Sequence, residues 1–173
     1  EQSLLPPALL FIVSIADADG RIIYSNRQSG LDDVADKDVF IRQRDADVLA
    51  VSKPEQLEEQ GPLYVHFSRR LSTQEDEFDG VAIVSVDSEY FVSSYEGNLL
   101  GDEGLLAIVD QDGVFIARRS GDSIFAGDVT DYSEVSSHFG QEELVAPNLT
   151  VNSWDGVERF TSALELFQFP VAV

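Results

Sequence analysis

The chain has 173 residues with 32 acidic and 11 basic side chains, which gives a net charge of −21. Such a surface repels phosphate backbones, so we expect no nucleic-acid partner. The chain has no Cys, which excludes disulfides, thiolate nucleophiles and zinc–thiolate sites, and its 43% hydrophobic content is typical of a folded protein.

The first predicted element is a β-hairpin whose strands are Ile12–Ala16 and Arg21–Ser25. The sequence Asp17-Ala18-Asp19-Gly20 separates them. An Asp-Gly pair between two apolar runs is a strong signal for a tight turn, because Gly readily adopts the positive φ that such turns need.

A polar segment with helical spacing follows, and then a second hairpin. We expect a helix over Leu31–Arg44, capped by Asp32 or Asp33. The next strands are Leu63–Leu71 and Phe78–Asp87, the second of which begins with a further Asp-Gly pair.

The second half of the chain repeats this order after a predicted linking helix, Ser88–Gly101. Its elements are a hairpin of Leu105–Val109 and Val114–Arg118 around Gly113, a helix over Asp131–Phe139, and strands over Asn148–Ser153 and Trp154–Leu164. Hairpin, helix, hairpin on one antiparallel sheet predicts an α+β fold in two tandem modules. We place the modules at residues 1–98 and 99–173.

The repeated Asp-x-Asp-Gly sequence also allows a calcium-loop interpretation. An EF-hand loop needs an oxygen ligand at its first position and a Glu six residues after its Gly. Both copies have Ile at the first position (Ile15 and Ile108), and Asn26 and Arg119 stand where the Glu belongs. We therefore predict chain reversals and no metal site.

Four stretches resemble the double Cache family, the paired PAS-like extracytoplasmic sensor domains of bacterial transmembrane receptors. They are FIVSIADADGRIIYSN from Phe11, DVADKDVFIRQRDADVLAVSKP from Asp33, FSRRLSTQEDEFDGVAIVSVDSEYFVSSYEG from Phe67 and DGVERFTSALELFQFPVAV from Asp155. The likeness is strongest to the branch fused to diguanylate cyclases and related cyclic-di-GMP enzymes. Lys37, Val39 and Ser52-Lys53-Pro54 depart from the family pattern in the region that lines its ligand site, so the ligand cannot be carried over.

The resemblance implies a periplasmic sensor that is not itself an enzyme. Residues 1–98 would form the membrane-distal PAS-like module and residues 99–173 the smaller proximal one, with membrane helices outside this segment. It implies a small-molecule ligand in the distal module, no cofactor, and room for a homodimer. The same module could also be a ligand-free structural or dimerisation element, or a calcium-dependent adhesion module.

The candidate ligand site is predicted around the strand Leu63–Leu71. Alternation places Arg69 on its mostly apolar face, where a guanidinium needs a carboxylate partner or an anionic ligand. The sequence leaves open a structural bridge to Asp36, Asp38 or Asp87, and a clamp for a carboxylate-bearing metabolite. The predicted ligand-binding residues are Arg69, Tyr64, Asp36, Phe40, Asp87 and Tyr90.

Other chemistry-bearing residues are assigned to structure. His66 is expected at the surface and Trp154 in the core of the second module. No nucleophile–base order, nucleotide loop or zinc-protease sequence occurs, and the two histidines, His66 and His138, fall in different halves. We therefore predict no catalytic residues.

Overall fold

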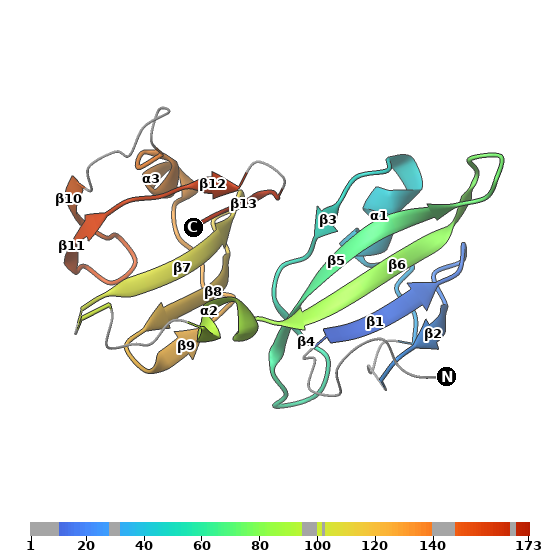
Figure 1. The fold of residues 1–173 in the computed structure, drawn as a ribbon, viewed down its shortest axis with the longest axis horizontal. Helices are drawn as coiled ribbons and strands as arrows, with labels where there is room; N and C mark the ends of the chain where they lie inside the picture. The colour runs from blue at the N-terminus through green and yellow to red at the C-terminus, as the bar shows by residue number, and fades with distance from the viewer. Residues whose placement is uncertain (1–10, 28–31, 95–99, 102, 140–147, 167–168) are drawn as a thin grey trace. The chain divides into compact units, whose positions relative to one another are not determined.

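The computed structural model describes residues 11–27, 32–94, 100–101, 103–139, 148–166 and 169–173 (Figure 1). The chain divides into two compact units. The first unit is Glu1–Ser52 with Gln56–Asp87, and the second is Lys53–Glu55 with Ser88–Val173. The predicted module boundary, between residues 98 and 99, lies outside the described residues and stays a prediction.

The first unit is one antiparallel sheet with a helix on one face (Figure 1). The strand order is β2-β1-β6-β5-β3, and β4 also pairs with β5. The strands are β1 (Phe11–Ala16), β2 (Ile22–Ser25), β3 (Ala50–Val51), β4 (Glu55–Gln56), β5 (Leu63–Ser72) and β6 (Phe78–Asp87). The two strand pairs predicted for this half are confirmed, β1 with β2 and β5 with β6.

Helix α1 (Asp38–Asp45) closes the core of the first unit. The core cluster holds Ala16, Val34, Phe40, Val81 and Ile83. The helix starts later than the predicted Leu31–Arg44 because the segment before it is bound to the first hairpin. The amide of Ile22 donates to the carbonyl of Asp32, and the Asp33 side chain accepts from Ala35. Neither aspartate is therefore the helix cap; that position is Lys37.

The second unit has a sheet of order β12-β13-β7-β8-β9 and a separate ribbon of β10 and β11. Its strands are β7 (Leu105–Asp110), β8 (Phe115–Ser120), β9 (Ser123–Phe125), β10 (Asn148–Val151), β11 (Glu158–Thr161), β12 (Glu165–Leu166) and β13 (Val171–Ala172). Strand β13 pairs with β7, so the last strand of the chain joins the sheet that the β7–β8 hairpin begins. The α+β class with two PAS-like modules is confirmed.

Two short helices belong to the second unit. Helix α3 (Tyr132–Ser136) is shorter than the predicted Asp131–Phe139, and Asp131 is its N-cap because its side chain accepts from the amide of Ser133. Helix α2 (Tyr90–Ser93) is the described part of the predicted linking helix, whose residues 95–99 lie outside the described residues.

The Asp-Gly pairs have different roles. Gly20 and Gly113 each take a positive φ in a hairpin turn, as predicted. Asp155–Gly156 stands in the turn between β10 and β11, where the amide of Asn152 donates to Val157. Gly80 instead lies inside β6, where a Cβ would approach the carbonyl oxygen of Ala16 to 2.1 Å. The β5–β6 reversal is made by residues 73–77, within which Thr73 and Glu77 are hydrogen bonded.

Candidate ligand site

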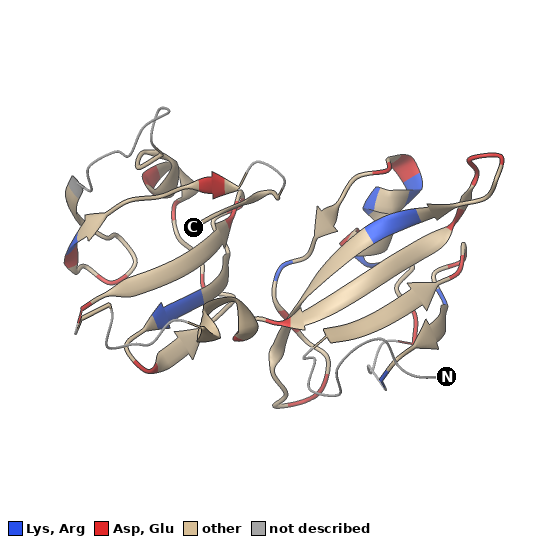
Figure 2. Cartoon of the chain, in the orientation of Figure 1, with Lys and Arg blue, Asp and Glu red and all other residues tan. Residues whose placement is uncertain are grey.

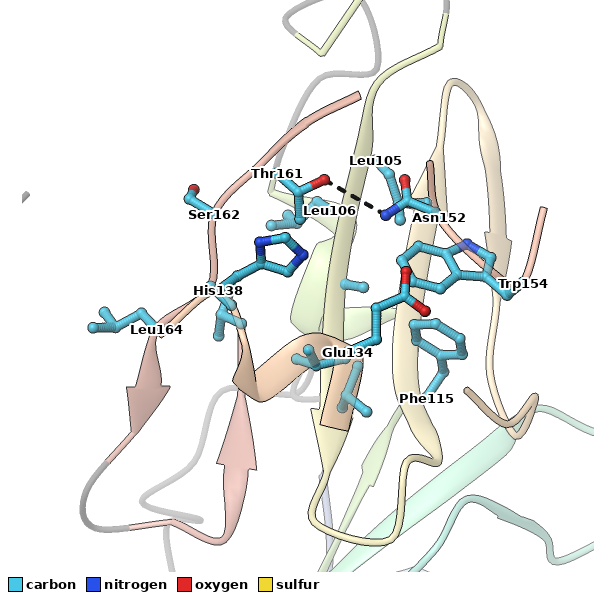
Figure 3. A pocket seen from close by; sticks show the side chains of 15 residues that line it. Leu105, Leu106, Phe115, Glu134, His138, Asn152, Trp154, Thr161, Ser162 and Leu164 are labelled. Carbon is cyan, nitrogen blue, oxygen red and sulfur yellow. Dashed lines mark hydrogen bonds between the residues drawn. The ribbon is translucent and has the colours of Figure 1, made fainter. Parts of the chain in front are cut away.

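A pocket of about 400 Å³ opens in the second unit beside the inner strand β7 (Figure 3). Sheet strands β7 and β8 form one wall, α3 and the residues after it form a second, and the β10–β11 ribbon with the chain after it forms a third. The lining residues are Leu105, Leu106, Ala107, Val109, Phe115, Glu134, Val135, His138, Asn152, Trp154, Thr161, Ser162, Ala163, Leu164 and Val173. Most of this lining is apolar.

Two aromatic rings form part of the wall. Phe115 and Trp154 meet edge to face, with ring centroids 5.5 Å apart and planes at 75°. Trp154 stands in the β10–β11 turn, and Phe115 begins β8 and is buried. This pairing holds the indole across the sheet surface.

Two buried polar atoms of the lining have no hydrogen-bond partner within the described part of the chain. They are Nδ1 of His138 and Nε1 of Trp154. The His138 side chain follows α3 and is only 8% exposed. Leaving a buried polar atom unpaired costs about 1–3 kcal/mol. Ser88, Arg118 and Thr130 also carry such atoms, but these residues do not line the pocket.

Glu134 brings a carboxylate to the same pocket from α3. Its Oε1 accepts a hydrogen bond of 3.1 Å from the amide of Ser153, the residue before Trp154. Its Oε2 has no hydrogen-bond partner among the residues that the structure describes. Figure 3 shows the Glu134 carboxylate and the His138 ring turned toward the space that Trp154 bounds.

A polar network fixes the third wall. Asn152 accepts from Arg159 at 2.9 Å and faces Thr161 at 3.5 Å (Figure 3). Arg159 also pairs with Asp155 at 2.8 Å. Desolvation raises the pKa of Asp155, but hydrogen bonds from Arg159 and from the amide of Val157, with the charge of Arg159, outweigh it and lower that pKa below its ordinary value. The network leaves Asn152 satisfied, so it supports the pocket rather than offering a free amide.

The second unit is strongly acidic. Residues 88–173 contain fifteen acidic residues and three arginines. All of them lie in the described part of the chain except four acids, Glu96, Asp102, Glu142 and Glu143. The arginines pair with carboxylates: Arg118 with Asp128 at 2.8 Å, Arg119 with Asp122 at 4.0 Å, and Arg159 with Asp155. None of the three lines the pocket. Acidic residues are spread over turns and strand ends of this unit (Figure 2).

The residues predicted to bind a ligand differ in their burial and in their neighbours. Tyr64 and Asp87 are opposite each other in the β5–β6 register. Phe40 is fully buried in the core, where it meets Phe78 edge to face. Asp36 and Tyr90 are exposed, and Tyr90 contacts Phe91.

Arg69 lies on the predicted face of β5, with Val65 and Phe67, but its expected bridge to Asp36, Asp38 or Asp87 is wrong. Its side chain is 64% exposed and pairs with Asp47 at 3.1 Å, an aspartate outside the predicted set. The other face of β5 is the one that α1 covers, so Ser68 and His66 are buried. A polar face can be buried there because Gln43 of α1 donates to the Ser68 carbonyl and accepts from the amide of Arg70. The expectation that His66 lies at the surface is therefore also wrong.

The pocket in the second unit is not predicted from the sequence, which indicates core packing for Trp154 and no role for His138. A usable signal was present: the single Trp of the chain adjoins an Asp-Gly turn, and one of only two histidines follows the helix that packs nearby.

No family model and no curated protein matches the chain. Solved structures do. The extracellular domain of rpHK1S-Z16, described as a histidine kinase, superposes with a TM-score of 0.73 at 24% identity, over 92% of this chain and 67% of that one. An extracellular ligand-binding receptor from Desulfohalobium retbaense gives a TM-score of 0.60 at 13% identity, over 93% of this chain and 29% of that one.

The ligand-binding domain of the Pseudomonas aeruginosa amino-acid chemoreceptor PctB, in complex with L-Gln, gives a TM-score of 0.52 at 19% identity, over 67% of this chain and 48% of that one. The chain has the fold of extracellular sensor domains. This sensor-domain fold confirms the fold expected from the double Cache resemblance. The matched structures are described as extracellular or ligand-binding domains. Within the described residues, no helix has the length and apolar character needed to cross a bilayer.

Proposed function

We propose that this chain is the extracytoplasmic, ligand-sensing part of a bacterial transmembrane signalling protein, and that its second unit binds a small molecule. The sensor-domain fold supports the first statement. The second depends on one observation: a pocket of about 400 Å³ is lined by His138 and Trp154, and each of these side chains has a buried polar atom, Nδ1 and Nε1, without a partner in the described chain. A bound molecule would supply those partners.

Ligand binding would act on the packing of the second unit. The pocket is bounded by three pieces that are not joined to one another by a common strand ladder: α3, the β10–β11 ribbon and the sheet. A ligand that prefers one arrangement of these pieces shifts the population toward that arrangement. Val173, next to β13, also lines the pocket and exchanges two backbone hydrogen bonds with Leu164, so the shift would reach β13.

The sequence resemblance is the basis for our proposal about the output domain. We propose that this domain is a diguanylate cyclase or a related cyclic-di-GMP enzyme, and that membrane helices connect it to this segment. The structural relatives include a histidine kinase and a chemoreceptor, so the sensor-domain fold serves more than one output.

A second candidate site is the one predicted in the first unit. The observation that favours it is the position of Tyr64 opposite Asp87 on β5 and β6. There an exposed Arg69 would be recruited to a carboxylate-bearing ligand only by leaving Asp47. We rank this site second because two of its predicted residues, Tyr64 and Arg69, lie on opposite faces of β5.

Calorimetry with the 173-residue chain tests both sites. A broad panel of amines, alcohols, amino acids, organic acids and polyamines is titrated into the wild type and into Trp154→Phe, His138→Leu and Arg69→Ala. Trp154→Phe keeps an aromatic wall but removes the N–H donor. We expect at least tenfold weaker binding for the two pocket variants, which is about 1.4 kcal/mol, and no change for Arg69→Ala.

Other outcomes separate the alternatives. Binding that Arg69→Ala abolishes and the pocket variants retain would move the ligand to the first unit. A flat response across the panel would favour the structural or dimerisation module, and a melting temperature that rises with calcium would favour the adhesion module. Circular dichroism of each variant verifies that it is folded.

A further inference from the structure

We infer that the pocket of the second unit selects a small amphipathic amine, with an apolar body, one ammonium group and one neutral hydrogen-bond acceptor, and that it rejects carboxylates. This inference rests on the proposed function and specifies its ligand. It differs from the sequence-based expectation, in which Arg69 of the first unit clamps a carboxylate-bearing metabolite.

We infer the ammonium group of the ligand from the carboxylate of Glu134. This carboxylate lines the pocket, and Oε1 is held toward the β10–β11 turn by the Ser153 amide. With Oε2 unpartnered in the described chain, the group can accept a charge-assisted hydrogen bond from a ligand cation. Trp154 and Phe115 offer aromatic surface, which favours a cation or an apolar group beside it.

We infer the hydrogen-bond acceptor of the ligand from the indole N–H of Trp154. An indole Nε1 can only donate, so the group that satisfies it must carry a lone pair. His138 Nδ1, on the opposite side of the pocket, can accept from or donate to another polar group of the ligand. A hydroxyl satisfies the indole, because its oxygen accepts.

We infer that the pocket rejects anions because no Lys or Arg is among its lining residues. The three arginines of residues 88–173 are paired with Asp128, Asp122 and Asp155, and none lines the pocket; Arg159 lines an adjoining cavity. A carboxylate entering an apolar pocket without a cationic partner loses its hydration and gains little in return. Glu134 would add repulsion between like charges.

Four ligands of one size separate charge from shape. They are phenylalaninol, which is cationic with a hydroxyl, 3-phenylpropanol, which is neutral, phenylalanine, which is zwitterionic, and 3-phenylpropanoate, which is anionic. We expect affinity to fall in that order, with phenylalaninol at least tenfold tighter than phenylalanine and no measurable binding of phenylpropanoate.

Glu134→Gln is the decisive variant, because Gln keeps an oxygen that can accept from the Ser153 amide. We expect this variant to bind phenylalaninol at least tenfold more weakly than the wild type and to bind 3-phenylpropanol with unchanged affinity. Glu165→Gln removes the same charge from the same unit at a residue that does not line the pocket. It should change the affinity for neither ligand.

Tighter binding of phenylalanine or phenylpropanoate than of phenylalaninol would overturn the inference while leaving the proposed sensor function intact. Equal weakening by Glu134→Gln and Glu165→Gln would overturn it as well, since the effect would then be one of net charge. If the four ligands fail but other molecules of the broad panel bind in a Trp154-dependent manner, the ligand class is wrong and the site stands. Failure of every ligand overturns the site itself.

Discussion

Asp17 and Asp110 hold the same position in the two hairpin turns of this chain. Oδ1 of Asp17 accepts from the amides of Asp19 and Arg21, and Oδ1 of Asp110 accepts from those of Asp112 and Val114, all at 2.8–3.0 Å. The repeated Asp-x-Asp-Gly sequence is therefore architectural: its first carboxylate organises the turn by binding backbone amides.

Removing this acceptor should cost stability, whereas removing only its charge should not. We expect Asp110→Ala to lower the free energy of unfolding by about 1–2 kcal/mol, because two turn amides lose their partner. Asp110→Asn keeps an acceptor oxygen and should stay within about 0.5 kcal/mol of the wild type. Urea unfolding measures both. Equal losses in the two variants would show that the charge matters, and a calcium-dependent melting temperature would then be the next measurement.

Gly113 should tolerate no side chain, since two constraints meet there. Its φ is +81°, and a Cβ would come within 2.1 Å of the Thr130 carbonyl oxygen. We expect Gly113→Ala to cost more than about 2 kcal/mol, by strain and steric conflict together.

Gly121 is the matched control for Gly113. It also has a positive φ, +56°, but nothing lies within 4 Å of a Cβ placed there. Gly121→Ala should therefore cost only the backbone preference, about 1–2 kcal/mol. Thermal melts of the two variants compare them, and an equal loss would contradict the close approach of Thr130.

Gln43 should stabilise the first unit through buried hydrogen bonds. Its fully buried side chain donates to the carbonyls of Val48 at 2.7 Å and Ser68 at 3.1 Å and accepts from the amide of Arg70 at 2.8 Å. We expect Gln43→Leu, which keeps the volume but orphans buried polar groups, to cost about 2–4 kcal/mol in chemical denaturation.

The control for Gln43 stands on the same helix. Arg42 is 55% exposed and forms a 3.7 Å pair with Asp38. Arg42→Ala should change the unfolding free energy by less than about 0.5 kcal/mol, as is usual for an exposed pair. A loss as large as that of Gln43→Leu would mean that helix α1 is held by its outer charges.

Asp155 should make the second unit sensitive to acid. Its pKa is lowered in the folded chain, so its ionised form stabilises the fold at neutral pH. That contribution is full above the unfolded pKa of about 3.9 and is lost as the pH falls through the lower folded pKa. The difference in melting temperature between wild type and Asp155→Asn should thus be constant from pH 7 to 5 and shrink below about pH 4.

Asp122 provides the comparison for this pH profile. Its side chain is fully exposed, and it lies 4.0 Å from Arg119. Asp122→Asn should alter the melting temperature little at any pH. A wild-type advantage over Asp155→Asn that persists at pH 2 would show that the Asp155 side chain acts through packing rather than through its charge.

Local patterns in the sequence determined the scaffold. Strands β1, β2, β5 and β6 were predicted nearly to the residue, because alternation and turn residues depend on neighbours along the chain. Helix α1 was predicted too long, since the pairing of Asp32 and Val34 with the first hairpin is a contact that sequence spacing does not reveal.

The tertiary structure decided where the site lies. The composition of β5 could not tell which of its faces α1 covers, because Gln43 makes a polar face buriable, and so the exposure of Arg69 and its pairing with Asp47 were not predicted. His138 and Trp154 are 16 residues apart, and only the folding of the β10–β11 ribbon beside α3 brings both to one pocket. Strand propensity is a property of short segments, whereas a pocket exists only where distant segments pack and leave space between them.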